Sequence, residues 1–468
     1  MMYQSTRGSA PASSFEDALL SGLAADGGLY VPAAWPKLTT HDIRALADLD
    51  YADLVARVIQ PFVGDAISNN DLTQMSRDAY TGFGHSAVAP LRQIDSRHWL
   101  LELFHGPTLS FKDYALQLVG RLFDHVLARR GTRIAIVGAT SGDTGSAAIE
   151  ACRDRGAIDI VMLHPAGRVS DVQRRQMTSV DAPNVFNVAL DGTFDDCQDM
   201  VKALFADQGM RRHYNLSAVN SINWARIMVQ IAYYFAAAVA LGAPQRRLSF
   251  AVPTGNFGNV YSAYGARRMG LPIERLAIGS NANDILTRFF ESGEMVIDPV
   301  RPSLSPSMDV QVSSNFERLL FEYCSRNGAT VERLMTRFRR DGRVSLGRAR
   351  WRRMSRLFQG HRLDDEGTTA LMRKVFTETG MVVDPHTAVG IAAGHALAAD
   401  SDCPVVSVAT AHPAKFPDAV EKAIGRRPDL PPHLADLLNR PERCVSLPNQ
   451  VEAVRDYVAS VVRGANNA

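Results

Sequence analysis

The stretch LFHGPTLSFKDYALQLV, residues 103–119, contains a lysine in an unusual position. Gly106-Pro107 signals a turn, and a helical pattern begins near Tyr114 and ends at Gly131. Lys112 is therefore expected at or just before a helix start, where the positive end of the helix dipole disfavours a cation. The apolar neighbours favour a buried lysine used as a Schiff-base former or general base. A solvated surface lysine is the alternative.

Length and composition indicate an ordinary globular protein. The 468 residues are too many for one core, so two to three domains are expected. The hydrophobic and charged fractions are 46% and 21%, and the net charge of +2 favours no strongly charged partner. We interpret the basic cluster at 337–356 as solvated helices rather than a nucleic-acid site. The sequence therefore predicts no nucleic-acid partner.

The cysteines and the hydrophobic runs bear on metal binding and location. Five cysteines are scattered without a CxxC pair, so we expect neither a disulfide framework nor a zinc site, and no metal centre. A reducing compartment fits this pattern. Residues 1–30 lack a signal-peptide core, and no apolar run reaches membrane-spanning length. We therefore expect a cytoplasmic protein with no membrane partner.

From about Trp99 the pattern alternates between short β-branched runs and helices. The expected strands are 134–137, 158–163, 185–190, 217–220, 248–252, 276–278 and 404–410. The expected helices are 114–129, 144–155, 170–179, 195–208, 223–241, 258–270 and 386–399. This alternation predicts βαβ units in an α/β fold with parallel sheets. Ligands in such folds bind at the carboxyl ends of the strands.

Two segments depart from the alternation and suggest domain boundaries. Residues 1–95 are mainly helical, and residues 299–375 are predicted to be an inserted helical subdomain without a convincing strand. The expected division is an N-terminal helical region (1–95), a large α/β domain (96–132 with 235–298 and 376–468), a smaller α/β domain (133–234) and the helical insertion (299–375).

Three loops after expected strands have residues suited to ligand binding. GATSGDTGSAA (138–148) and PTGNFGNV (253–260) are rich in glycine and hydroxyl residues before a helix, an arrangement that leaves backbone N–H groups open to an anion. Simple helix capping is the alternative for the first loop. TAHPAKF (410–416) is a weaker candidate, because Lys415 can be a surface lysine and His412 a core histidine. Two anion sites and an unusual lysine suggest a phosphorylated cofactor and an anionic substrate.

The segments HGPTLSFKD, ATSGDTGSAA, PTGNFGN and TAHPAKF, in this order, resemble the pyridoxal-phosphate enzymes of the tryptophan-synthase β-like fold. More narrowly, they resemble the threonine synthase family in its longer bacterial and fungal form, and the opening residues 5–32 agree. The resemblance implies a fold type II pyridoxal-phosphate enzyme. Its two parallel-sheet α/β domains would accompany the N-terminal helical region and the helical insertion.

The resemblance also implies roles for individual residues. Lys112 would form the Schiff base with pyridoxal 5′-phosphate and act as the catalytic residue. The other cofactor-binding residues would be Asp143, Gly255, Asn256, Phe257, Gly258, Asn259 and Thr410. Those for the substrate α-carboxylate would be Thr140, Ser141, Gly142 and Thr144. Those for the substrate phosphate, in NSINWAR, would be Asn220, Ser221 and Arg226. A surface salt bridge is the alternative for Arg226, and Asp143 stands where related folds usually have Asn.

The implied function is a lyase of threonine biosynthesis. O-phospho-L-homoserine and water would give L-threonine and phosphate by γ-elimination and β-hydration. A phospholyase releasing 2-oxobutyrate from the same substrate, a threonine or serine dehydratase, and a non-catalytic metabolite-binding protein are the alternatives. The family includes monomers and homodimers, so the oligomeric state stays open.

Overall fold

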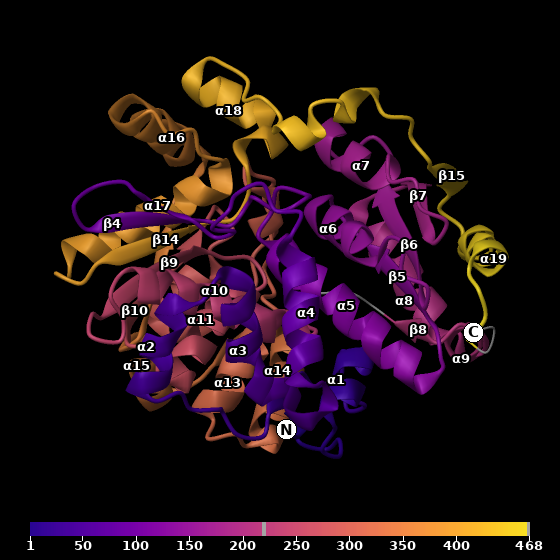
Figure 1. Cartoon of the computed structure of the whole chain (residues 1–468), viewed down its shortest axis with the longest axis horizontal. Coiled ribbons are helices and arrows are strands. Elements are labelled where there is room, and N and C mark those ends of the chain that lie inside the picture. The colour runs from indigo at the N-terminus through magenta and orange to yellow at the C-terminus, as the bar shows by residue number, and fades with distance from the viewer. Residues whose placement is uncertain (218–220, 466–468) are drawn as a thin grey trace. The chain divides into compact units, whose positions relative to one another are not determined.

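The computed structural model describes residues 1–217 and 221–465, and the chain in it divides into two compact units. The first unit comprises Met1–Ala18, Leu23–Phe111 and Ser221–Pro428. The second comprises Leu19–Gly22, Lys112–Asn220 and Asp429–Ala468. Figure 1 labels the elements of both units along the chain. Among the described residues, no helix combines the length and apolar character needed to cross a membrane.

The first unit is built on a six-stranded sheet in the order β13-β10-β9-β14-β4-β3. Its strands are β3 (Leu91–Gln93), β4 (His98–Glu102), β9 (Leu248–Pro253), β10 (Ile273–Ser280), β13 (Phe358–Arg362) and β14 (Val405–Ala409). All neighbouring pairs are parallel except β3 with β4. The loops after β9 and β14 therefore leave the same edge of this sheet, at the carboxyl ends of adjacent strands.

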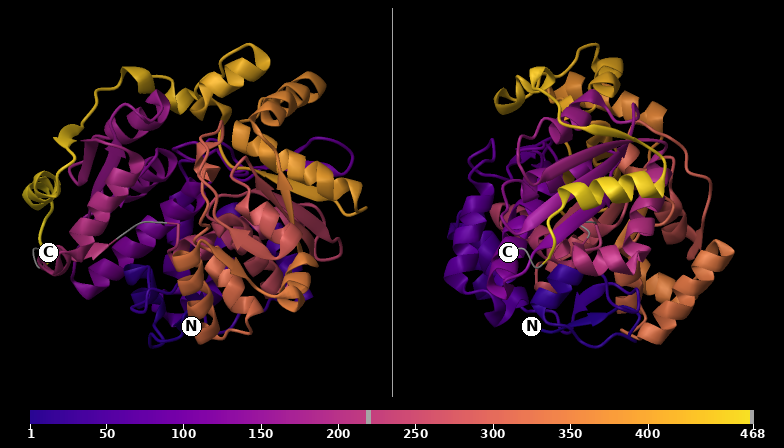
Figure 2. Two further views of the ribbon diagram at one scale, coloured as in Figure 1. Left: turned by 180° about the vertical axis from the view of Figure 1, so that it is seen from behind. Right: turned by 90° about the vertical axis from the view of Figure 1, so that its right-hand side faces the viewer.

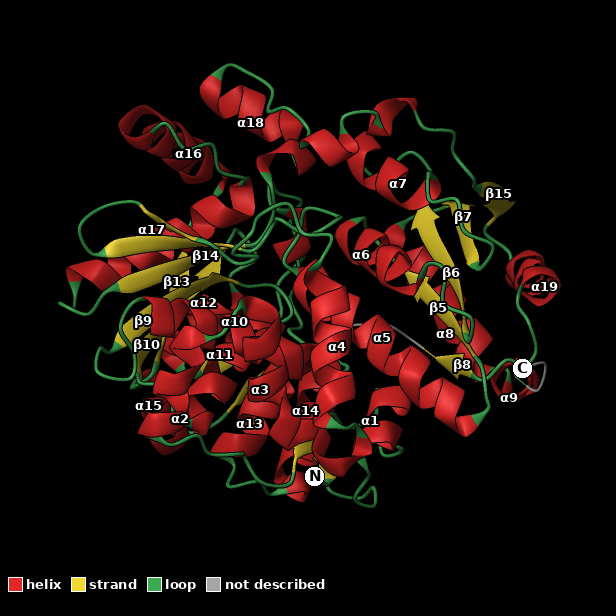
Figure 3. Ribbon diagram, viewed as in Figure 1, coloured by secondary structure: helices red, strands yellow, loops and turns green. Residues whose placement is uncertain are grey.

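Helices cover both faces of this sheet, as Figure 3 shows by colour. A Cβ on Gly279 would lie 3.0 Å from the carbonyl oxygen of Val389 in α17 (Pro385–Ala399). Gly360 of β13 lies beside Ile278, the residue before Gly279 in β10. A Cβ on Gly360 would lie 2.5 Å from Thr287 Cα in α12 (Ile285–Ser292). Successive strand residues face opposite sides, so α17 and α12 pack on opposite faces.

The remaining elements of this unit surround that core. They are β1 (Tyr3–Ser5), α1 (Phe15–Ser21, ending in the second unit), β2 (Tyr30–Pro32), α2 (Thr40–Ala45), α3 (Tyr51–Val63), α4 (Asn69–Tyr80), α10 (Trp224–Ala240), α11 (Gly258–Met269), β11 (Glu294–Val296), α13 (Phe316–Tyr323), α14 (Gly328–Asp341), β12 (Arg343–Ser345), α15 (Arg348–Ser355), α16 (Asp365–Thr379) and α18 (Pro417–Ile424).

The second unit contains a five-stranded parallel sheet in the order β15-β7-β6-β5-β8. Its strands are β5 (Ile134–Ala139), β6 (Ile158–Pro165), β7 (Val185–Asp191), β8 (Leu216–Ser217) and β15 (Val445–Pro448). Its helices are α5 (Lys112–Arg130), α6 (Asp143–Cys152), α7 (Asp171–Thr178), α8 (Phe194–Ala206), α9 (Gln208–His213) and α19 (Val451–Val461). The alternation of strand and helix predicted for this region is present.

A close approach between α5 and α6 depends on one glycine. A Cβ on Gly120 of α5 would lie 2.3 Å from the carbonyl oxygen of Ala151 in α6, closer than real Cβ atoms approach backbone. The two helices can therefore pack with their backbones nearly touching. This packing holds the start of α5, and with it Lys112, against the helix that begins at Asp143.

The structure differs from the sequence analysis in four places. Residues 112–132 were assigned to the larger domain and residues 221–234 to the smaller one, whereas Lys112–Asn220 belongs to the second unit and Ser221–Pro428 to the first. Residues 299–375 were expected to lack strands, but β13 pairs in parallel with β10 and forms an edge of the main sheet. The segment after 428 was assigned to the larger domain, whereas β15 pairs with β7 in the second unit. In Figure 2 this C-terminal segment, in yellow, runs beside the magenta strands of that unit. The differences at β13 and β15 involve short edge strands whose pairing partner is distant in sequence.

Candidate active site

Lys112 is the first residue of α5, as predicted, and its side chain is buried. The segment before it is fastened to the loop after β14. The Phe111 N–H donates to the Thr410 carbonyl oxygen at 2.9 Å, and Lys415 Nζ donates to the Thr108 carbonyl oxygen at 2.7 Å. Lys415 is fully buried, so the surface alternative for it is wrong. The TAHPAKF loop therefore fixes the chain immediately before Lys112.

The Lys112 ammonium group faces a buried carboxylate. Lys112 Nζ lies 3.1 Å from Asp143 Oδ2, and Gln173 Nε2 donates to Asp143 Oδ1 at 2.9 Å. Gly142 adopts φ of +137°, and a Cβ there would lie 2.6 Å from the Gln173 amide carbon. Glycine at this position therefore makes room for the Gln173 side chain that holds Asp143.

The predicted carboxylate-binding loop forms the start of α6. Thr140 Oγ1 accepts hydrogen bonds from the N–H groups of Gly142 and Gly145, both at 2.9 Å. The N-cap residue of α6 is Gly142 and no side chain caps it, so Thr140 ties the loop to the first turn from outside the cap position. Ser141 is exposed and Thr144 is half-buried, so their hydroxyl groups remain accessible at the positive end of the helix. An anion at this helix start is compatible with both observations.

The loop after β9 turns tightly into α11. Phe257 has φ of +62°, in the left-handed region, and Gly258 begins the helix. A Cβ on Gly255 would lie 2.5 Å from the Ser307 carbonyl oxygen, so glycine is needed for this close approach. The tight turn places the N-terminal N–H groups of α11 at the carboxyl edge of the sheet, where they suit a phosphate.

Asn259 offers a defined donor at this helix start. The hydroxyl groups of Tyr233 and Tyr234 donate to Asn259 Oδ1 at 2.5 and 2.6 Å, which fixes the orientation of the amide. Asn259 Nδ2 is buried and hydrogen-bonds to no residue that the structure describes. A buried donor without a partner is costly, so a ligand oxygen would stabilise it.

Arg226 lies in the first turn of α10 and is 4% exposed. Its Nε and Nη1 atoms have no hydrogen-bond partner among the described residues. Burial lowers the pKa of Arg226 to about 10. The surface salt bridge considered for this residue is therefore wrong. A buried guanidinium without a carboxylate is suited to a bidentate anionic ligand.

Asn315 was not predicted, yet it joins two predicted segments. Its Nδ2 donates to the carbonyl oxygens of Ser221 and Asn256, both at 3.0 Å. Ser313 supports the same loop, because its hydroxyl donates to the Gly255 carbonyl oxygen at 2.6 Å. The sequence SSNFE at 313–317 gave no periodic or motif signal for this role. The start of the expected insertion thus supports the loop before α11.

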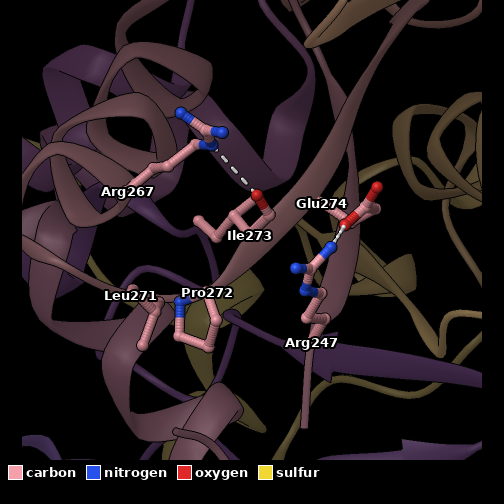
Figure 4. A pocket seen from close by; sticks show the side chains of 6 residues that line it. All are labelled: Arg247, Arg267, Leu271, Pro272, Ile273 and Glu274. Carbon is pink, nitrogen blue, oxygen red and sulfur yellow. Dashed lines mark hydrogen bonds and ion pairs between the residues drawn. The ribbon is translucent and has the colours of Figure 1, made fainter. Parts of the chain in front are cut away.

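The described site residues fall in two groups. Lys112 and residues 140–144 belong to the second unit, whereas Ser221, Arg226, residues 255–259 and Thr410 belong to the first. Asn220 lies outside the described residues. A pocket lined by Arg247, Arg267, Leu271, Pro272, Ile273 and Glu274 contains none of them (Figure 4).

That pocket lies where β9 and β10 begin, away from the carboxyl ends of the strands. The cations in it already have partners: Arg247 Nη1 lies 2.8 Å from Glu274 Oε2, and Arg267 Nε donates to the Ile273 carbonyl oxygen at 3.0 Å. This pocket therefore does not coincide with the loops in which the sequence predicts ligand binding.

Comparisons with known proteins agree with this geometry. Family models described as "Threonine synthase N terminus", "Pyridoxal-phosphate dependent enzyme" and "Threonine synthase, C-terminal" match residues 2–80, 85–337 and 387–458. A threonine synthase from Pseudomonas aeruginosa is 54% identical over 98% of both chains. The structure of a pyridoxal-phosphate-bound threonine synthase from Brucella melitensis matches with a TM-score of 0.97 and 50% identity, over 99% of this chain and 100% of that one.

The structure of threonine synthase from yeast matches with a TM-score of 0.94 and 37% identity, over 98% of both chains. The fold type II assignment and the family resemblance are thereby confirmed. The chain belongs to the threonine synthase family of pyridoxal-phosphate-dependent enzymes.

Proposed function

We propose that this protein converts O-phospho-L-homoserine and water to L-threonine and phosphate, by γ-elimination followed by β-hydration. The observation that carries the choice of a phosphorylated substrate is Arg226, a buried cation whose Nε and Nη1 bind no described residue. A dehydratase acting on threonine or serine has no substrate phosphate to bind such a group. The proposed location is the cytoplasm, because all five cysteines are free thiols, which is typical of a reducing compartment.

The residues fit pyridoxal 5′-phosphate as cofactor. Lys112 is a buried primary amine able to bond to the aldehyde, and Asn259 Nδ2 is a buried donor in need of an acceptor. The N–H groups at the start of α11 add donors for the cofactor phosphate, with Gly255, Asn256, Phe257 and Gly258 forming the turn. When bound, the cofactor supplies an electron sink for charge developing at the substrate α-carbon.

Lys112 carries the proton transfers in this proposal. With the cofactor bound, the neutral Nζ would remove the α-proton, help to move a β-proton to the γ-carbon as phosphate leaves, and finally return a proton to the α-carbon. Asp143, held by Gln173, sets the position of Nζ through its own contact at 3.1 Å. Thr410 would offer a hydroxyl to the ring nitrogen of the cofactor. A hydroxyl holds that nitrogen protonated less strongly than a carboxylate does. The cofactor would therefore withdraw electrons less strongly than one whose ring nitrogen is paired with a carboxylate.

The anionic groups of the substrate are bound at two helix starts in this proposal. The α-carboxylate is placed at the start of α6, with Thr140, Ser141, Gly142 and Thr144. The phosphate is placed at the start of α10, with Arg226, Ser221 and Asn220. Arg226 stays with the phosphate as it leaves the γ-carbon, so the charge of the leaving group is met by a guanidinium fork. Water then adds at the β-carbon.

The test is a product assay with O-phospho-L-homoserine. Purified enzyme is incubated with this substrate, and phosphate, threonine and 2-oxobutyrate are quantified. We expect phosphate and threonine in equal amounts. Phosphate with 2-oxobutyrate would instead identify a phospholyase. A protein that binds the cofactor but releases no phosphate would overturn the substrate assignment and favour a metabolite-binding role.

A further inference from the structure

Three residues that can bind a metal lie together at the amino end of β4. Asp95, in the turn between β3 and β4, His98, the first residue of β4, and His395 of α17 each place one ligand atom within 4.8 Å of the others. They belong to the first unit. His98 pairs with Val405 at the start of β14, whereas Thr410 follows the end of that strand. Within this unit, the cluster therefore lies at the end of the sheet opposite Thr410 and the loop after β9.

The hydrogen bonds of His98 fix its tautomer. Ser407 Oγ donates its proton to the Gly390 carbonyl oxygen at 3.0 Å, so it can only accept from His98 Nε2, which lies 2.8 Å away. Nε2 therefore carries the hydrogen, and Nδ1 presents a lone pair. His98 is completely buried, and Nδ1 has no hydrogen-bond partner among the described residues.

The neighbouring helix brings a second imidazole close to the His98 ring. A Cβ on Gly394 would lie 2.6 Å from His98 Nε2 and 2.4 Å from Ser407 Oγ, so glycine lets α17 approach the strands closely. The next residue, His395, then has its ring centroid 5.1 Å from that of His98. His395 is half-buried, so part of its ring is accessible.

The carboxylate comes from a firmly held turn. Asp95 Oδ1 accepts from the Arg97 N–H at 2.8 Å, and the Asp95 N–H donates to the His98 carbonyl oxygen at 3.3 Å. Asp95 is exposed, so its second oxygen can rotate toward the imidazoles without breaking the core. Glu378 of α16 adds negative charge near His395, although Lys374 on the same helix offsets part of it.

We propose that Asp95, His98 and His395 form a binding site for a divalent transition metal of the zinc type, distinct from the active site. His98 supplies Nδ1 and Asp95 supplies a carboxylate oxygen, and solvent completes the shell on the exposed side. The Ser407 hydroxyl orients the His98 ring in the way that outer-shell acceptors orient metal-bound imidazoles. Tetrahedral zinc with bonds of about 2.0–2.1 Å needs its ligand atoms about 3.3 Å apart. The three ligand atoms now lie within 4.8 Å of one another. Rotation of the exposed Asp95 and half-buried His395 side chains brings them to the shorter spacing.

Cobalt(II) is the probe for the experiment, because it takes zinc sites and its visible d–d bands report the ligands. The cofactor-loaded full-length enzyme is treated with a chelator, desalted and dialysed against cobalt(II). Bound cobalt is measured by elemental analysis and by absorbance beyond the cofactor band. Wild type is compared with Asp95→Asn and His395→Asn, which alter accessible side chains, and with His41→Asn, which alters an exposed histidine elsewhere.

We expect wild type and His41→Asn to bind a single cobalt ion per chain, with d–d bands. Asp95→Asn and His395→Asn should bind it at least about tenfold more weakly and lose those bands. Far-UV circular dichroism checks that all variants are folded. Equal cobalt binding by wild type and His395→Asn, or no cobalt bound by wild type, would overturn the proposal. Product formation plays no part in this readout, so failure here leaves the proposed function untouched.

Discussion

Gln173 donates to Asp143 Oδ1 at 2.9 Å, while Asp143 Oδ2 lies 3.1 Å from Lys112 Nζ. Gln173 is held by its own helix start: its N–H donates to Ser170 Oγ at 3.3 Å, and Ser170 Oγ donates to Gln173 Oε1 at 2.9 Å. The amide oxygen is thereby occupied, and Nε2 must face Asp143. The N-cap residue of α7, Ser170, thus orients Gln173, and Gln173 positions Asp143 beside Lys112.

Gln173→Leu should therefore disturb Lys112 without touching the substrate. Loss of a hydrogen bond to a charged group is worth about 1.5–3 kcal/mol, so kcat should fall about tenfold or more while KM changes little. The midpoint of the pH titration of the cofactor absorbance should shift as well. Asp171→Ala, on the same helix turn but exposed, is the control. An unchanged titration in Gln173→Leu would limit Gln173 to a structural role.

Lys112→Ala should abolish both turnover and the visible absorbance of the bound cofactor, because the covalent link and the base are lost together. Spectra of the purified protein and phosphate release from O-phospho-L-homoserine measure the two effects. Lys422→Ala, an exposed lysine of α18, should behave as wild type. Turnover near wild type in Lys112→Ala would refute the assignment of this lysine.

Arg226→Met should have opposite effects on stability and on substrate binding. A buried cation without a carboxylate destabilises the free protein, so its removal should raise the free energy of unfolding by about 1 kcal/mol or more. The KM for the phosphorylated substrate should rise about 10-fold to 100-fold, as one or two charge-assisted hydrogen bonds are lost. Urea unfolding and steady-state kinetics test the two effects, with Arg333→Met on the surface as control. A less stable variant with unchanged KM would point to a structural arginine.

Asn315→Ala should weaken cofactor binding although Asn315 is assigned no contact with the cofactor. Its amide holds the carbonyl oxygens of Ser221 and Asn256, and a lost buried hydrogen bond costs about 1–3 kcal/mol. We expect the Kd for pyridoxal phosphate, from titration of the apoenzyme, to rise about tenfold. Asn327→Ala removes a cap of α14 in the same region and should leave that Kd unchanged.

His98 should make the protein sensitive to mild acid in the presence of a chelator. Its pKa is about 4 in the folded protein and 6.5 ordinarily, so the unfolded chain binds the proton first as the pH falls. Stability contributed by the neutral ring is present above pH 6.5 and is lost as the pH falls toward 4, by about 3 kcal/mol in all. Urea midpoints of wild type should therefore fall more steeply over this range than those of His98→Gln. If the urea midpoints of the two proteins fell equally with pH, His98 would not be a buried neutral imidazole in the folded protein.

Sequence alone predicted the local secondary structure around the candidate site residues. The apolar run after Lys112 predicted the start of α5, and the glycine-rich loops at 138–148 and 253–260 do pass from strand to helix. These features depend on residues close together in the chain, through helix periodicity, capping and turn conformation. The roles assigned to the site residues came from the ordered motifs of the family and remain predictions.

Only the tertiary structure decided which distant residues act together. The edge strands β13 and β15 are short, and their pairing depends on strands far away in the chain. The hydrogen bonds of Asn315 and the cluster of Asp95, His98 and His395 also join residues far apart in sequence. A side chain's neighbours across a fold depend on how sheets and helices pack, and no local pattern encodes them. The sequence therefore determined where the helices and loops that carry the candidate site residues begin, and tertiary packing determined which residues hold them in place.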